Sequence, residues 1–194
     1  MLLGNTLTLT ATVKNTTDTS VNWSVNGVAG GNTTVGMIST AGAYTAPADL
    51  PSPATVQVTA TSQADSTKSA TVGVTVESDI GISVAPGNAG VELGAVQGFR
   101  APITSNGHPD TAVRWSVSGA ACAPNCGSVD ANGNYTAPPI LPANPNVTLT
   151  AQSVADASKQ ASAAITITSN FTLQISAPAS VPTGGTATLV ATLT

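Results

Sequence analysis

Hydrophobic and polar residues alternate along several short stretches of the chain. In a β-strand successive side chains point to opposite faces, so each of these stretches has one apolar face. Turn-forming Gly, Pro, Asn and Asp residues separate the stretches. The pattern therefore predicts short antiparallel strands rather than helices. The alternating stretches are residues 21–25, 56–60, 70–76, 113–117, 147–151 and 161–167.

These stretches belong to an internal repeat of about 90 residues. Val-x-Trp-Ser-Val occurs around Trp23 and again around Trp115, and Gly-x-Tyr-Thr-Ala-Pro occurs at residues 42–47 and 133–138. A third motif, Gly-x4-Leu/Phe-x-Ala, starts at Gly4, at Gly94 and at Gly184. A period of this length suits a small β-sandwich domain and is too long for a solenoid unit.

The repeat divides the chain into three parts. We expect a first repeat over residues 1–78 that lacks its first strand, and a second repeat over residues 79–169. Residues 170–194 then supply the opening strands of a third repeat. Below, these are the first repeat, the second repeat and the third segment.

One segment has the composition of a helix. Residues 155–164 are rich in Ala, the best helix former. Their counterpart, residues 64–73, leads into a β-branched alternating stretch. Because repeated segments should share a conformation, we predict strand, turn and strand in both, and almost no helix.

Short strands at regular intervals, with one Trp in each repeat, indicate an all-β fold of tandem immunoglobulin-like antiparallel sandwiches. The large apolar rings should fill the space between the two sheets of each sandwich. The predicted core residues are Trp23, Tyr44, Phe99, Trp115 and Tyr135.

Composition changes this picture in one respect. Charged residues make up only 7% of the 194 residues, against about 25% in ordinary globular proteins, while 41% are hydrophobic. The chain can therefore build a core, and neutral Thr, Ser and Asn must solvate its surface. Five basic residues argue against a nucleic-acid partner. No apolar run reaches the roughly 20 residues of a membrane span, and the first residues do not resemble a signal peptide.

The three motifs Val-x-Trp-Ser-Val, Gly-x-Tyr-Thr-Ala-Pro and Val-x-Val-Thr-Ala-x-Ser together resemble bacterial immunoglobulin-like domains. The resemblance covers the whole chain, and the Gly-x-Tyr-Thr-Ala-Pro element is its most specific part. It implies extended, non-enzymatic stalks of secreted or cell-surface proteins, found in adhesins or beside carbohydrate-active enzymes. The family brings no catalytic residues and no cofactor. This chain departs from the pattern at its incomplete first and third units.

Cys122 and Cys126 are separated by three residues and follow the strand of Trp115. We expect a local disulfide, which suits an oxidising extracellular setting. A zinc site would need a second pair of ligands, and a redox site would need Cys-x-x-Cys. Val35 stands opposite Cys126 in the first repeat, so the fold does not depend on the bridge.

Two acidic segments are candidate calcium sites. Residues 130–134, Asp-Ala-Asn-Gly-Asn, resemble part of a calcium loop, but no glutamate follows. Their counterpart at residues 39–43 keeps the glycine without the oxygen ligands, which favours a hairpin turn. Glu77 and Asp79 lie where the two repeats join and could hold calcium there, although residues 168–170 at the next junction contain no carboxylate.

His108 is the only histidine, in a loop rich in turn formers. We expect it to be exposed, because a catalytic triad would need a nucleophile on a strained turn and none is apparent.

The incomplete ends allow two explanations. The chain is either a segment of a longer repeat protein, or it assembles head to tail. In the second case Phe171, Leu173, Ile175 and Val181 of one copy would fill the first-strand position in the first repeat of the next. A contact of this kind does not close, so it would produce a fibre.

The expected function is that of a non-enzymatic spacer in an extracellular surface, adhesive or fibre-forming protein. Its partners would be neighbouring repeats or other copies of itself. The alternative is an accessory module that binds a surface glycan or protein. Sugar-binding platforms present exposed aromatic rings, whereas the Trp and Tyr residues here recur at core-like positions. We expect no cofactor, no metal, no nucleic acid and no membrane insertion.

Overall fold

The protein is described by a computed structural model that covers residues 1–120, 122, 125–177 and 180–193. Within these ranges the chain is entirely β-strand, turn and loop, which confirms the predicted all-β class. Residues 155–159 form a turn that leads into β17 (Gln160–Thr168), so the strand prediction for the Ala-rich segment is also confirmed. No helix in the described part of the chain is long and apolar enough to cross a membrane.

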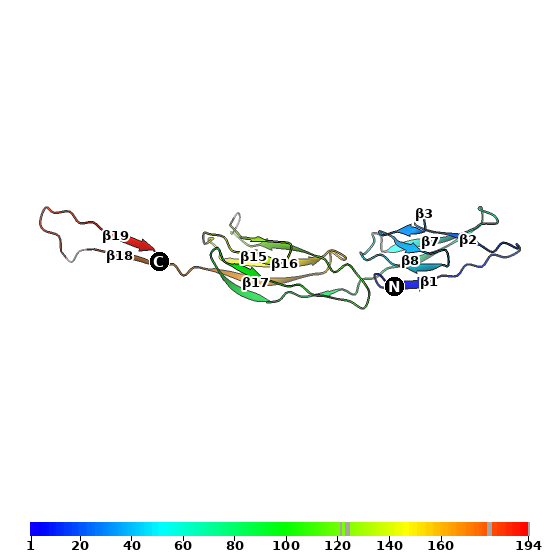
Figure 1. Ribbon diagram of the computed structural model, residues 1–194, viewed down its shortest axis with the longest axis horizontal. Helices are drawn as coiled ribbons and strands as arrows, with labels where there is room; N and C mark the ends of the chain where they lie inside the picture. Colours follow the sequence, from blue (N-terminus) through cyan, green and yellow to red (C-terminus); the bar gives the residue numbers. More distant parts are fainter. Residues whose placement is uncertain (121, 123–124, 178–179, 194) are drawn as a thin grey trace.

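The first repeat forms two four-stranded sheets that face each other (Figure 1). One sheet has the order β3 (Val28–Ala29), β2 (Val21–Val25), β7 (Thr55–Ser62) and β8 (Ser69–Thr75). The other has the order β1 (Thr6–Thr8), β6 (Ala43–Thr45), β5 (Gly36–Ile38) and β4 (Gly31–Asn32). Both sheets contribute to the core between them, which includes Val25, Ile38, Tyr44, Val56 and Val58.

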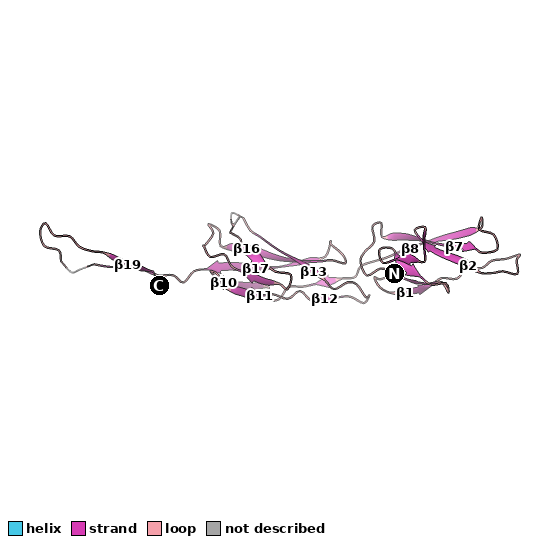
Figure 2. Cartoon of the chain, turned by 45° about the horizontal axis from the view of Figure 1, so that its top comes forward, coloured by secondary structure: helices cyan, strands magenta, loops and turns pink. Residues whose placement is uncertain are grey.

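The second repeat has the same plan with extra strands (Figure 2). Its larger sheet has the order β10 (Asn88–Glu92), β17, β16 (Asn146–Ser153) and β13 (Val113–Ser118). The facing sheet has the order β11 (Val96–Gly98), β15 (Asn134–Thr136) and β14 (Ser128–Val129). A short pair, β9 (Gly81–Ile82) and β12 (Ile103–Thr104), completes it.

The sequence repeat is also a repeat of strand pairing. Trp23 lies opposite Ala60 on β7, and Trp115 lies opposite Ala151 on β16. The two sandwiches are therefore built in the same register. The described part of the third segment forms an antiparallel ribbon of β18 (Leu173–Ser176) and β19 (Val190–Leu193), which extends away from the second repeat (Figure 1).

The aromatic residues of the two sandwiches divide into two groups. Tyr44, Phe99 and Tyr135 are almost completely buried, whereas the indoles of Trp23 and Trp115 are half-buried and pack against the edge of each core. The tyrosine and phenylalanine rings thus occupy the centres of the sandwiches, a place that the sequence suggested for the indoles. Trp23 lines a groove on the open side of the first sandwich.

The two repeats differ at one edge. In the second repeat β10 runs parallel to β17, with Glu92 opposite Thr168. In the first repeat this pairing is reduced to a single parallel bridge between Leu2 and Glu77, and β8 is the edge of its sheet.

Candidate functional site: the junction between the two sandwiches

Backbone groups of the two sandwiches bond directly to each other. Donors come from both sides, so the contact depends on the position of both main chains. The hydrogen bonds are from His108 N to Leu3 O at 2.7 Å, from Asp110 N to Ala48 O at 3.0 Å and from Leu50 N to Ala155 O at 2.8 Å. The Asn5 Oδ1 and His108 Nδ1 atoms lie 3.1 Å apart and add a side-chain contact.

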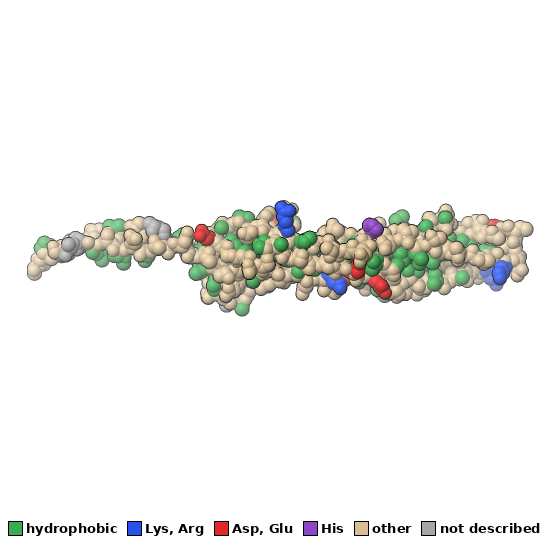
Figure 3. All heavy atoms as spheres, turned by 90° about the horizontal axis from the view of Figure 1, so that it is seen from below, with side chains coloured by type: hydrophobic (Ala, Val, Ile, Leu, Met, Phe, Trp, Pro, Cys, Tyr) green, Lys and Arg blue, Asp and Glu red, His purple; other side chains and the backbone are tan. Residues whose placement is uncertain are grey.

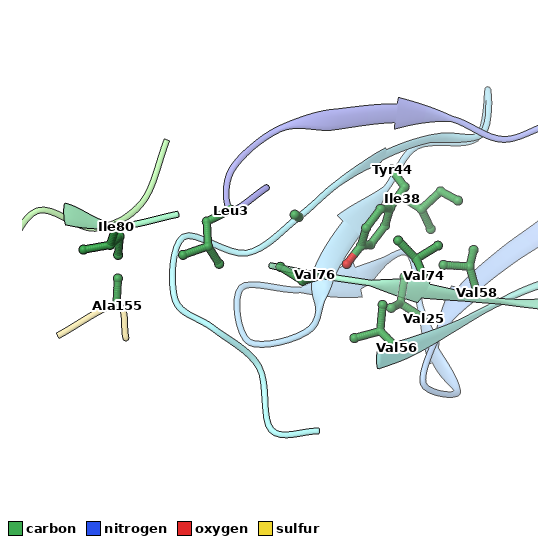
Figure 4. Packing of buried hydrophobic residues seen from close by; sticks show 11 residues of the cluster. Leu3, Val25, Ile38, Tyr44, Val56, Val58, Val74, Val76, Ile80 and Ala155 are labelled. Atoms are coloured by element: carbon green, nitrogen blue, oxygen red, sulfur yellow. The ribbon is translucent and has the colours of Figure 1, made fainter. Parts of the chain in front are cut away.

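The hydrophobic core of the first repeat continues across the junction. Ile80 and Ala155 of the second repeat belong to the same buried cluster as Leu3, and Leu50 and Ile103 pack against it. Leu3, Ile80 and Ala155 lie together at one end of this cluster (Figure 4). The exposed fraction of each of these three side chains is 4% or less. The junction is therefore dry at its centre, which opposes separation of the sandwiches.

Two glycines allow the loops to come this close. A Cβ atom at Gly107 would lie 2.6 Å from the Leu3 carbonyl oxygen, and one at Gly4 would overlap the carbonyl oxygen of His108. Gly4 has a φ of +67°, which its counterpart Gly94 shares at +73°. The φ of Gly107 does not lie in the left-handed region. Only the close contact at the junction therefore requires glycine at this position.

Asp79 holds the loop that carries this contact. Its carboxylate accepts a hydrogen bond from the Ser105 hydroxyl and two from Asn106, through the backbone N at 2.9 Å and Nδ2 at 2.9 Å. These hydrogen bonds lower the pKa of Asp79 to about 2, and the one from Ser105 has the largest effect. The turn at residues 105–106 is thus anchored directly before Gly107 and His108.

The segment of Glu77 and Asp79, considered above as a candidate calcium site, has a different use in this structure. The Asp79 oxygens face hydroxyl and N–H donors, which are not the surroundings of a cation. Glu77 contributes its backbone, donating to Met1 O at 2.8 Å and accepting from Leu3 N at 3.2 Å. Among the described residues, no three His, Cys, Asp or Glu side chains lie close enough together to hold a metal ion.

A second carboxylate lies beside the junction. Asp156 follows Ala155 and is 6% exposed. Burial raises its pKa, but hydrogen bonds from Ser158, through N at 3.0 Å and Oγ at 2.6 Å, contribute to a net decrease. The Ser78 hydroxyl acts in the same direction, although it makes no hydrogen bond of standard geometry. Asp156 therefore stays ionised and fixes the turn that presents Ala155.

His108 is exposed and reaches Asn5 across the junction.

Residues 130–134 form a hairpin turn in which the Asp130 carboxylate accepts hydrogen bonds from Asn132 N at 2.9 Å and from Asn134 N and Nδ2, both at 2.8 Å. The Asn134 side chain is the largest cause of the lowered pKa of Asp130. The oxygens of Asp130 thus serve the turn itself.

Cys122 and Cys126 form a disulfide with a Cα–Cα distance of 4.8 Å. Residues 121, 123 and 124 in the same loop lie outside the described part of the chain. The Tyr135 hydroxyl donates to the Cys126 carbonyl at 2.9 Å, and Tyr44 donates to Val35 in the same way at 2.7 Å. The same bond therefore forms with and without a disulfide.

Leu3 links His108 to the segment of residues 77–79, which the sequence treated separately, because its carbonyl accepts from His108 N and its N–H donates to Glu77 O. The sequence did not indicate Leu3, Ile80, Ala155 or Gly107 as junction residues. One signal was present: the offset between the repeats rises from 90 residues at Ile103 to 92 residues at Trp115. The intervening loop is thus two residues longer in the second repeat, and it carries the contact to the first.

Comparison with known proteins gives structural neighbours only. No protein-family model and no curated protein sequence matches the chain. Similar solved structures include repeats EC22–24 of mouse cadherin-23, at 14% identity and a TM-score of 0.35 over 86% of this chain. Domains 1–6 of the surface layer protein SbsC match at 15% identity and a TM-score of 0.35 over 91%. The four N-terminal Ig domains of Dscam1 isoform 9.44 match at 12% and 0.37 over 87%.

The chain spans 59%, 25% and 42% of these three structures, respectively. The neighbours are cadherin, surface-layer and immunoglobulin repeats of low identity. The chain's own strand pairing defines its fold.

Proposed function

We propose that this chain is a non-enzymatic spacer of an extracellular bacterial protein, in which residues 1–78 and 79–169 act as two rigidly joined immunoglobulin-like units. The observation that carries the proposal is the junction. Domains joined only by a linker move freely by default, and a shared buried core with backbone bonds in both directions opposes such motion. The units follow one another along the long axis of the molecule (Figure 1). Such an arrangement sets how far the protein extends and how stiff it is.

One further feature supports an extracellular setting. The Cys122–Cys126 disulfide suits an oxidising compartment. The surface shown in Figure 3 is mostly neutral, with few charged side chains, so solubility depends on Thr, Ser and Asn. Antibodies against the chain should label intact cells of the source organism. Labelling that appears only after lysis would contradict this location.

The stiffness of the junction can be measured with spin labels on Thr8 of β1 and Thr148 of β16, both exposed. A fixed junction should give one narrow distance distribution by double electron–electron resonance. A broad distribution in the intact chain would overturn the spacer proposal.

The alternative function, as a glycan-binding accessory module, has one observation in its favour. The half-buried indole of Trp23 lines an open groove, and aromatic rings in grooves can stack on sugars. However, the centrally placed rings Tyr44, Phe99 and Tyr135 are buried and offer no platform. Saturable binding on a glycan array, lost in Trp23→Ala, would favour the alternative.

The proposal includes end-to-end assembly of copies by strand donation from the third segment. Its support is the exposure of that segment: Phe171, Leu173, Ile175 and Val181 are 57%, 68%, 68% and 45% exposed, respectively.

A further inference from the structure

The first sandwich has an open groove of about 730 Å³ on the side where its edge strand β8 lies. Leu9, Val13, Trp23 and Val72 are among the residues that line it. Val72 is 47% exposed, whereas its counterpart in the second repeat, Ala163, is 2% exposed. In the second repeat, the position that corresponds to this groove is therefore covered.

The second repeat shows what covers it. Ile82 on β9 lies opposite Ile103 on β12, and Ala85 forms an antiparallel bridge with Arg100. The chain then continues into β10, which runs along β17. Between these pairings Val84 packs against the core. The cover is thus one segment with inward-facing aliphatic side chains at alternate positions.

The third segment contains a second copy of this cover. Leu173 lies opposite Leu193, and Ser176 lies opposite Val190. These pairs correspond in sequence to Ile82 with Ile103 and to Ala85 with Arg100, one repeat later. The β18–β19 ribbon therefore has the register of the covering strand and its partner, but its aliphatic side chains are exposed.

The strand that β18 pairs with in the ribbon also has a copy in the first repeat. Residues 184–193 and residues 4–13 are identical at six of ten positions: Gly, two Thr, Leu, Ala and Thr in the same order. Residues 9–13 lie along the groove and belong to no strand of the structure. Residues 9–13 therefore resemble β19, the partner of β18. They also lie at the position where the second repeat has the strand that pairs with its covering segment.

We infer that the groove of one copy receives β18 of a second copy, which exchanges its partner β19 for residues 9–13. This inference rests on the proposed assembly and adds the strand of the acceptor that is paired, residues 9–13, and the register of the pairing. Leu173 lies opposite Val13 and Ile175 opposite Ala11, because Leu193 and Ala191 occupy those positions in the ribbon. The exchange replaces one β-ladder by an equivalent one and buries side chains that are exposed in the ribbon. The contact is heterologous and therefore extends head to tail.

The first test is the mass of the intact chain in solution as its concentration rises. Light scattering should show open-ended growth that Leu173→Asp with Ile175→Asp abolishes. Neither substitution touches a buried residue, so both sandwiches should still fold. Val96→Asp, at an aliphatic residue that is 64% exposed outside the groove and the ribbon, should assemble like the unchanged chain. A monomer at all concentrations, or unchanged growth of the double variant, overturns the inference.

The register has its own test. Copies with Ala11→Cys mixed with copies with Ile175→Cys should form an interchain disulfide under mild oxidation. The pair of Val13→Cys with Ile175→Cys is out of register and should crosslink several-fold less. Preference for the second pair, or equal yields, overturns the register.

A peptide of residues 171–181 should block growth of the intact chain. Oligosaccharide binding at Trp23, with growth unaffected by the peptide, would show that the groove has another occupant. All these results are independent of the spin-label distance within one copy, so failure here leaves the rigid spacer testable by itself.

Discussion

The backbone N–H of His108 donates a hydrogen bond to the carbonyl oxygen of Leu3 at 2.7 Å, and so joins the loop of the second sandwich to the first. The bond uses main-chain atoms on both sides, and Gly107 beside it leaves room for the approach. The angle between the sandwiches therefore depends on loop backbone rather than on a charged side-chain pair. Substitutions that add atoms between the two loop backbones should therefore change this angle most.

Gly107→Ala should loosen the junction. The added Cβ would stand 2.6 Å from the Leu3 oxygen, so the loop must shift and overpacking should cost about 1–3 kcal/mol of stability. The distance distribution between labels at Thr8 and Thr148 should broaden. Gly87→Ala is the matched control, since a Cβ there meets nothing within 4 Å. Equal behaviour of the two variants would show that Gly107 is not a clearance residue.

Asp79→Asn should reduce the acid sensitivity of the junction. The pKa of Asp79 is about 2 in the folded chain, below its ordinary value of 3.8. Its contribution is therefore fully present above about pH 4 and is lost as the pH falls toward 2. The difference in melting temperature between pH 5 and pH 2.5 should be smaller in the variant than in the unchanged chain. An identical difference would contradict a role for this carboxylate.

Tyr44→Phe and Tyr135→Phe should each destabilise their own repeat by about 1–2 kcal/mol. Each change removes a hydroxyl that satisfies a backbone carbonyl, of Val35 or of Cys126, while the ring packing remains. Because the two sites lie in different cores, the effects should add in the double variant. Guanidinium unfolding monitored by circular dichroism measures both. A loss below about 0.3 kcal/mol would mean that water replaces the phenol at no cost.

Replacement of both cysteines, Cys122→Ser with Cys126→Ser, should cost the second repeat about 2 kcal/mol. The closed loop is short, so the entropy that the disulfide removes from the unfolded chain is small. Reduction with dithiothreitol should give the same decrease in the unchanged chain. The first repeat contains no cysteine and is the internal control, and a comparable decrease there would contradict a local role.

Much of the fold could be predicted from local pattern. The alternation around Trp23 and Trp115 places both on strands, and the structure pairs them with equivalent partners, Ala60 and Ala151. The Ala-rich segment before β17 was interpreted correctly only through its counterpart in the first repeat. Its own helix propensity favours the wrong state, and pairing in a sheet overrides that preference.

The junction was not predictable in the same way. Ile80 and Ala155 are small or medium apolar residues next to turns, and no period distinguishes them from other surface positions. Their burial arises because a loop that is two residues longer brings the second sandwich against Leu3. The indoles show the same limit, since no local pattern distinguishes these half-buried rings from the buried rings of Tyr44 and Tyr135.

The amino-acid sequence by itself determined the longer alternating strands and the repetition of one sandwich, because side-chain alternation and turn chemistry act over a few residues. Only the tertiary structure decided how the two sandwiches meet, which aromatic rings are enclosed and where a groove stays open. Those properties depend on contacts between backbone atoms and loops that are far apart in the chain. Such contacts produce no periodic pattern in the sequence.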